Sequence, residues 1–205
     1  MLDRMYRLFP RNIGAGTIDD QLLKTLRHQA EELFGSQEAI DMSSTLAGDL
    51  VEQIALPLTL PVAKELKREF EQACELWIRE SSRDWEDHGR RFWPDGSYRI
   101  EVYEIWLNRQ VEGDHNPVHV HGGLFSGVLY LKVPPQIDGI NRGGTIGFHG
   151  PECFDPEKFQ MGMIQYLQPK EGEYFVFPAW QPHSVNPFRG EGERWSLAFN
   201  AVAQR

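Results

Sequence analysis

Cysteine is almost missing from this chain, which has only Cys74 and Cys153 among its 205 residues. Two cysteines cannot build the disulfide framework that small secreted domains depend on. The N-terminal residues Met1 to Arg4 are of mixed polarity, so no secretory signal is expected. Together these features predict a reducing, cytoplasmic environment for the protein.

Long hydrophobic runs and excess positive charge are also lacking. No apolar stretch approaches the roughly 20 residues that a membrane-spanning helix needs. The 21 Lys and Arg residues are outnumbered by 30 Asp and Glu residues, which gives a formal net charge of −9. Nucleic-acid backbones are bound by basic surfaces. We therefore expect neither a membrane nor a nucleic acid as partner. The oligomeric state cannot be inferred from the sequence.

What remains is ordinary globular composition, with 40% hydrophobic and 25% charged residues. The length suits a single domain spanning residues 1–205. The pattern changes near residue 97, because the first part is mostly helical and residues 98–205 consist of short β-rich runs separated by Gly and Pro. We expect residues 1–97 to pack as a helical part on a β-rich core.

Helical periodicity marks two segments in the first part. One runs from Ile18 to Phe34, with Thr17 as its N-cap and Gly35 as its stop signal. The other begins at Pro61, which suits a first helical turn, and continues to about Glu80. A short helix over 46–56 and an edge strand over 6–10 are weaker expectations.

Six strands are expected in the second part, over 99–108, 118–121, 125–133, 145–149, 174–177 and 194–202. In the first of these, strict alternation would place Ile100 and Val102 on one face and Tyr103, Ile105 and Leu107 on the other. Short strands with frequent turn signals are typical of a sandwich or barrel. The predicted fold is mainly β, with the N-terminal helices on one outer face.

Three histidines carry the strongest functional signal. His119 and His121 are two residues apart, so they share one face of a regular strand. His183 follows a second predicted strand that ends at Pro178. Three imidazoles from two separate stretches can form a facial set of metal ligands and leave coordination positions open.

Arg194 and Ser196 lie further along, on one face of the last predicted strand. Arginine grips a carboxylate through two parallel hydrogen bonds, so this pair suits the far carboxylate of an organic acid that chelates the metal. The alternative is a surface arginine paired with Glu191 or Glu193.

Five blocks of sequence together resemble a known family. They are Asn116-Pro117-x-His119-x-His121, Ser126-Gly127-Val128-Leu129-Tyr130-Leu131, Gly143-Gly144-Thr145-Ile146-x-Phe148, Phe177-Pro178 followed by His183-Ser184-Val185-x-Pro187, and Arg194-x-Ser196-x-Ala198-Phe199-Asn200. In their order and spacing they resemble a bacterial and phage family of iron(II)- and 2-oxoglutarate-dependent oxygenases, which is similar in turn to prolyl-hydroxylase-type enzymes. The resemblance covers roughly residues 98–202.

The resemblance implies a double-stranded β-helix, a jelly-roll or cupin-like barrel with iron(II) in its mouth. It implies His119 and His183 as iron ligands. The wider superfamily usually has an acid at the place of His121, and this departure makes the identity of the metal less certain. Either His121 is the third ligand or it lies outside the first coordination shell.

The resemblance also implies that Arg194 and Ser196 bind the cosubstrate 2-oxoglutarate. Tyr130 would add a hydroxyl donor if its strand face looks into the barrel, and it would otherwise be a core tyrosine. Three further residues, Asn116, His115 and Trp180, are candidates for contacts with the substrate or the metal ligands. The implied activity is hydroxylation of an unidentified small molecule or peptide.

Two other classes of protein compete with this reading. A cupin-type metalloprotein that does not use 2-oxoglutarate would share the barrel and metal, and residues around Gly113 and Gly172 partly match the two cupin motifs. The cupin glutamate is missing, however, since residues 122–126 include none. The second alternative is a non-catalytic binding module with the same barrel.

Overall fold

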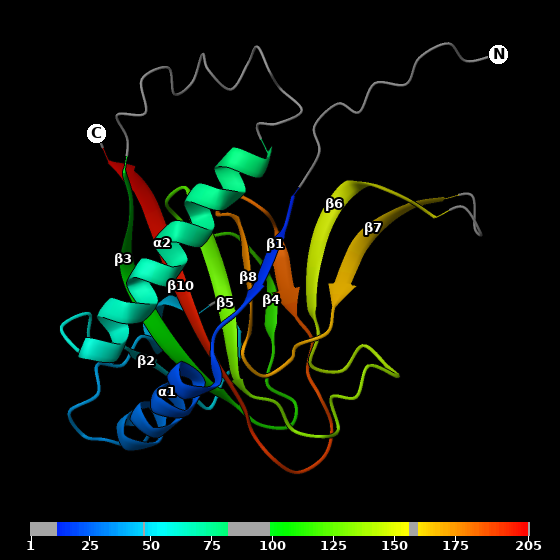
Figure 1. The fold of residues 1–205 in the computed structure, drawn as a ribbon. Coiled ribbons are helices and arrows are strands. Elements are labelled where there is room, and N and C mark those ends of the chain that lie inside the picture. Colours follow the sequence, from blue (N-terminus) through cyan, green and yellow to red (C-terminus); the bar gives the residue numbers. More distant parts are fainter. Residues whose placement is uncertain (1–11, 47, 82–98, 156–159, 205) are drawn as a thin grey trace.

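The computed structural model describes residues 12–46, 48–81, 99–155 and 160–204. Two antiparallel sheets and two helices make up this part of the chain (Figure 1). The edge strand expected over 6–10 lies outside the described residues.

The larger sheet has six strands. In spatial order they are β1 (Gly14–Thr17), β8 (Glu173–Pro178), β5 (Phe125–Lys132), β10 (Arg194–Gln204), β3 (Arg99–Gln110) and β2 (Glu52–Ala55). The smaller sheet has four, in the order β4 (Asn116–His119), β9 (His183–Val185), β6 (Ile146–Asp155) and β7 (Gln160–Leu167). This arrangement is the predicted double-stranded β-helix.

The main hydrophobic core lies between the larger sheet and the helices α1 (Asp20–Leu33) and α2 (Pro61–Ser81), which cover one face of it (Figure 1). α2 presents a stripe that includes Val62, Leu66 and Phe70 at helical spacing, and these side chains are buried. Neither described helix is long and apolar enough to cross a membrane. The opposite face of the larger sheet is thereby left for the pocket.

The ends of α1 correct one prediction. Asp19, not Thr17, is the N-cap, because its carboxylate accepts hydrogen bonds from the backbone N–H groups of Gln21 and Leu22, both at 2.9 Å. Thr17 instead ends strand β1, which the sequence did not reveal. The stop at Gly35 is confirmed, since this residue has a φ of +75° directly after the helix end.

The helix expected over 46–56 is wrong. A short 3-10 helix, η1, covers Ser43–Thr45, and residues Glu52 to Ala55 form β2, which pairs antiparallel with β3. Gln53 and Ile54 are buried by this pairing. A strand held by a partner some 50 residues away is decided by tertiary contacts that no local pattern encodes.

A bulge in β3 overturns the expected division of its faces. Asn200 pairs with Glu104 and the next residue, Ala201, pairs with Val102, so Tyr103 is the extra residue on β3. The alternation of side chains between the two faces of β3 restarts at this residue. Ile100 and Val102 consequently lie in the same core as Ile105 and Leu107, while Tyr103 is 41% exposed.

Candidate metal centre

The three histidines come from the smaller sheet and the turn beside it. His119 ends β4 and stands directly opposite His183 of β9 in the strand register. The strand expected over 118–121 is wrong at its end, because β4 runs from Asn116 to His119. His121 therefore lies in the following turn, where its backbone N–H donates to the carbonyl of Ala179 at 2.9 Å.

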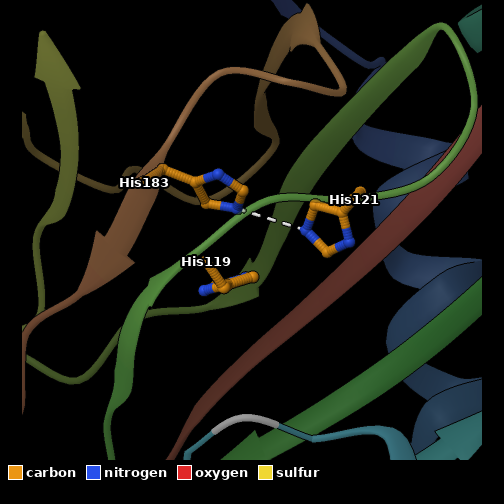
Figure 2. A group of neighbouring side chains, drawn as sticks. All are labelled: His119, His121 and His183. Carbon is orange, nitrogen blue, oxygen red and sulfur yellow. Dashed lines mark hydrogen bonds between the residues drawn. The ribbon is translucent and has the colours of Figure 1, made fainter.

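The imidazoles converge despite this correction. Their candidate ligand nitrogens all lie within 4.8 Å of one another, and Nε2 of His121 is 3.2 Å from Nε2 of His183 (Figure 2). Nδ1 of His119 lies 2.7 Å from the Pro117 carbonyl and Nδ1 of His183 lies 2.9 Å from the Gln181 carbonyl. A carbonyl can only accept, so Nδ1 carries the proton and Nε2 keeps the lone pair that a metal needs.

Burial favours the neutral form of these rings. It lowers the pKa of His183 to about 3 and that of His121 to about 4, with the neighbouring His119 adding to the effect. The pKa of His119 is also lowered by burial. Neutral imidazole is the ligating form, so at neutral pH each of the three rings can offer a nitrogen lone pair to a metal ion. This donor set fits a divalent metal ion.

A cavity of about 300 Å³ lies beside the histidines, between the two sheets. Arg194 of β10 enters it from the larger sheet and is only 2% exposed. Its guanidinium donates to Oε1 of Gln110 and to the carbonyl of Gly144. No carboxylate among the described residues forms an ion pair with it. The alternative partner Glu193 pairs with Arg109 and Lys132 instead.

A buried guanidinium that forms no ion pair within the described part of the chain fits a carboxylate ligand, because an unpaired charge in the interior is costly. Burial lowers the pKa of Arg194 to about 10, which still leaves it charged at neutral pH. Ser196 follows on the same face and pairs in register with Tyr130 of β5. Burial raises the pKa of Tyr130, so its hydroxyl stays protonated and able to donate.

The three weaker candidates for substrate contacts differ in their position relative to the cavity. Asn116 lines the cavity, and its Oδ1 atom is buried without a hydrogen-bond partner in the described part of the chain. His115 is exposed, and its backbone forms a bridge to Asp49 outside the cavity. Trp180 is 57% exposed and is not part of the cavity wall.

Sequence reasoning missed most of the wall that β3 contributes. Glu104, Trp106, Asn108 and Gln110 alternate along its inner face. Nε2 of Gln53 in β2 lies 2.9 Å from Oδ1 of Asn108. The signal that could have revealed this surface was the set of polar residues at 104, 108 and 110, which share one strand face with Trp106.

A double-stranded β-helix with three converging imidazoles and a buried arginine in one cavity is the arrangement expected of a metal-dependent protein that binds an organic acid. Residues 104–200 match the sequence profile of the family described as "Putative 2OG-Fe(II) oxygenase". These residues, which run from β3 into β10, belong to that family. The protein is an oxygenase that depends on iron(II) and 2-oxoglutarate.

Solved structures with the same fold support this assignment of the architecture. A prolyl-4-hydroxylase from Pseudomonas putida aligns with a TM-score of 0.58 at 17% identity, covering 93% of this chain and 92% of that one. A prolyl hydroxylase from Trichoplax adhaerens, in complex with a peptide fragment of hypoxia-inducible factor, gives 0.61 at 11%, with 94% and 84% covered. The α-ketoglutarate-dependent epimerase SnoN from nogalamycin biosynthesis gives 0.64 at 14%, with 95% and 78% covered. A comparison with curated protein sequences finds no match.

At these identities the structures show the fold alone, and they include both hydroxylases and an epimerase. The family match favours the oxygenase over the cupin alternative and the non-catalytic module. The roles of individual side chains in this chain follow from its own geometry.

Proposed function

We propose that the protein is a hydroxylase in which His119, His121 and His183 hold iron(II), while Arg194 anchors 2-oxoglutarate. The observation that carries the proposal is the pairing of two features in one cavity. Three neutral imidazole nitrogens lie within 4.8 Å of one another, and a buried guanidinium without a carboxylate partner among the described residues enters the same space.

Each side chain then has a defined task. The imidazoles would hold the cation, and the rings of His119 and His183 are oriented for this because their Nδ1–H groups donate to backbone carbonyls. Arg194 binds the far carboxylate of the cosubstrate, with hydroxyl donors Ser196 and Tyr130 beside it. Iron(II) and 2-oxoglutarate, when bound, supply the activation of dioxygen that oxidises a C–H bond.

The apolar part of the wall keeps the reaction centre dry. Phe177 lies against His183 with 4.7 Å between ring centroids, and Trp106 lies 5.7 Å from His121. Both aromatic residues line the cavity and are buried. Exclusion of water strengthens every charged contact inside the site and protects reactive species from side reactions.

His121 in place of an acidic ligand leaves one more positive charge on the metal site. The doubly negative cosubstrate offsets this charge once it is bound. We therefore propose that iron(II) and 2-oxoglutarate bind cooperatively, since each lowers the electrostatic cost of the other.

The substrate class stays open between a small molecule and a peptide. The Trichoplax structure holds a peptide, and the cavity of this chain is large enough for a side chain or a small metabolite. We also propose a single domain over 1–205 and a cytoplasmic location, the latter because two cysteines do not suit an oxidising compartment.

The test separates the two halves of the site by measuring iron(II) and 2-oxoglutarate binding without oxygen. His183→Ala should abolish stoichiometric iron(II) binding. Arg194→Gln should retain iron(II) and bind 2-oxoglutarate about 10- to 100-fold more weakly, as expected from loss of a charge-assisted hydrogen bond of ~1.5–3 kcal/mol. Calorimetry and metal analysis measure both quantities.

His28→Ala is the matched control, because His28 lies on α1 with its side chain 75% exposed. Arg194→Lys keeps the charge but loses the two-pronged geometry, so it should fall between wild type and Arg194→Gln. Full iron(II) binding by folded His183→Ala would refute the ligand assignment. Unchanged 2-oxoglutarate affinity in folded Arg194→Gln would refute the anchor.

A further inference from the structure

The end of the cavity away from Arg194 carries a second polar pair, Glu104 of β3 and Asn200 of β10. The two residues are opposite each other in the strand register. Nδ2 of Asn200 donates to Oε1 of Glu104 at 2.7 Å, and both residues line the cavity. Neither is a candidate metal ligand, and the site proposed above uses neither.

Glu104 accepts hydrogen bonds from Asn200 and from the Tyr103 hydroxyl, but the pair still keeps one unused acceptor and a negative charge without a cation among the described residues. Asn200 is 5% exposed, and its Oδ1 atom is buried with no hydrogen-bond partner in the described part of the chain. Glu104 has no ion pair with any described Lys or Arg. Its neighbour Tyr103 has a raised pKa, first because of burial and then because of the Glu104 carboxylate. A buried carbonyl oxygen beside a carboxylate calls for a ligand that brings N–H donors and positive charge.

The pair also lies on the metal side of the cavity. Trp106 is two residues from Glu104 on the same face, and its ring lies 5.7 Å from that of His121. Gly122, which follows His121, lines the same cavity. Asn200 is six positions from Arg194 on β10, roughly 20 Å along a strand that rises ~3.3 Å per residue. A cosubstrate anchored at Arg194 therefore leaves the Glu104 end free.

We propose that Glu104 and Asn200 bind a protonated amine of the substrate and thereby place a neighbouring C–H bond at the metal. The inference rests on the proposed function, because it takes the Arg194 end as the cosubstrate site. Glu104 accepts the charge and Asn200 Oδ1 accepts a second N–H. The indole face of Trp106 suits a cation or its alkyl chain. The net charge of −9 favours approach of a cationic substrate.

The experiment compares two probes of equal length, n-hexylamine and n-hexanol, on oxygen-free protein loaded with iron(II) and 2-oxoglutarate at neutral pH. Calorimetry measures the affinity of each. The wild type should bind the amine about tenfold or more tightly than the alcohol. In Glu104→Gln this preference should shrink to within about twofold, and in Asn200→Ala it should be reduced.

Glu101→Gln is the matched control, because it makes the same change on the same strand at a residue that pairs with Lys67 outside the cavity. This variant should keep the full preference. Asn200→Asp, which adds a second carboxylate, should retain or increase it, and thermal melting shows whether each variant is folded.

Three outcomes would overturn the proposal. They are no amine binding by the wild type, an equal affinity for the alcohol, and a preference that survives in folded Glu104→Gln. Loss of iron(II) from Glu104→Gln would place Glu104 with the metal instead and would also overturn it. Failure of the proposed function looks different, since the wild type would then not take up iron(II) and 2-oxoglutarate at all.

Discussion

At the scale of single residues, the site is built from charge states that burial controls. His183 is 4% exposed and packed against Phe177, so its ring is held neutral with its pKa lowered to about 3. Arg194 cannot lose its charge and instead keeps polar partners in Gln110 and Gly144. A neutral cluster at one place and a fixed cation at another give the cavity two distinct binding ends.

The lowered pKa values of the buried histidines predict that the metal-free protein loses stability in acid. The pKa of His183 is lower in the folded protein than its ordinary value of 6.5. Between these two pKa values the unfolded chain therefore binds more protons than the folded chain. Its contribution to stability is fully present above pH 6.5 and is lost as the pH falls through that range toward 3. Chemical denaturation of metal-free protein at pH 7 and pH 5 should give a lower free energy of unfolding at the lower pH.

His183→Asn should flatten this dependence, because it removes the group with the largest shift in pKa among the three rings. Identical pH dependence in wild type and variant would show that the His183 imidazole does not control the acid response. The exposed His28→Asn serves as control and should leave the dependence as it is.

At the scale of elements, the helices fix the strand that carries Arg194. Phe70 of α2 stacks on Phe199 of β10 with ring centroids 4.1 Å apart and an angle of 16°. Both rings are fully buried. The neighbours of Phe199, Ala198 and Asn200, point the other way into the cavity. Packing on one face of β10 thus sets the position of cavity residues on its opposite face.

Phe70→Ala should lower the free energy of unfolding by ~3–5 kcal/mol, since it removes a buried aromatic ring and leaves a cavity. Leu76→Ala on the same helix is the control, because Leu76 is 46% exposed, and its effect should stay within about 1 kcal/mol. Denaturant unfolding measures both. A cost for Phe70→Ala no larger than that of the control would contradict the role given to α2.

The helices and strands also show where local sequence patterns were insufficient to predict the structure. α2 was predicted from its first residue because Pro61 and a helical stripe are properties of the segment itself. β2 was missed, and the faces of β3 were misassigned at Tyr103, because strand pairing and a bulge depend on β10 and β3 meeting in space. β7, which pairs antiparallel with β6, was missed as well.

At the scale of the whole molecule, the β-rich part depends on the N-terminal part for its covering. The larger sheet buries Ile100, Leu129 and Leu197 beneath helices α1 and α2. Residues 98–205 alone would expose that face to water, and large exposed apolar patches promote association.

We therefore predict that residues 98–205 produced alone do not fold cooperatively. Circular dichroism should show no sharp thermal transition, whereas the full chain should show one. Cooperative melting and stoichiometric iron(II) binding by the fragment would contradict the single-domain prediction for 1–205.

Residue types and their spacing were enough to predict which groups could form the site. The spacing of His119 and His121, the distant His183 and the pair Arg194 and Ser196 were sufficient to predict a metal and an acidic cosubstrate, because ligand chemistry belongs to residue types. Three contacts could be seen only in the folded molecule. His121 reaches the other histidines from the loop after β4, Gln110 and not Glu193 is the partner of Arg194, and Glu104 faces Asn200. These contacts join residues far apart in the chain, and their existence depends on strand register, which is set by the packing of both sheets and the helices together.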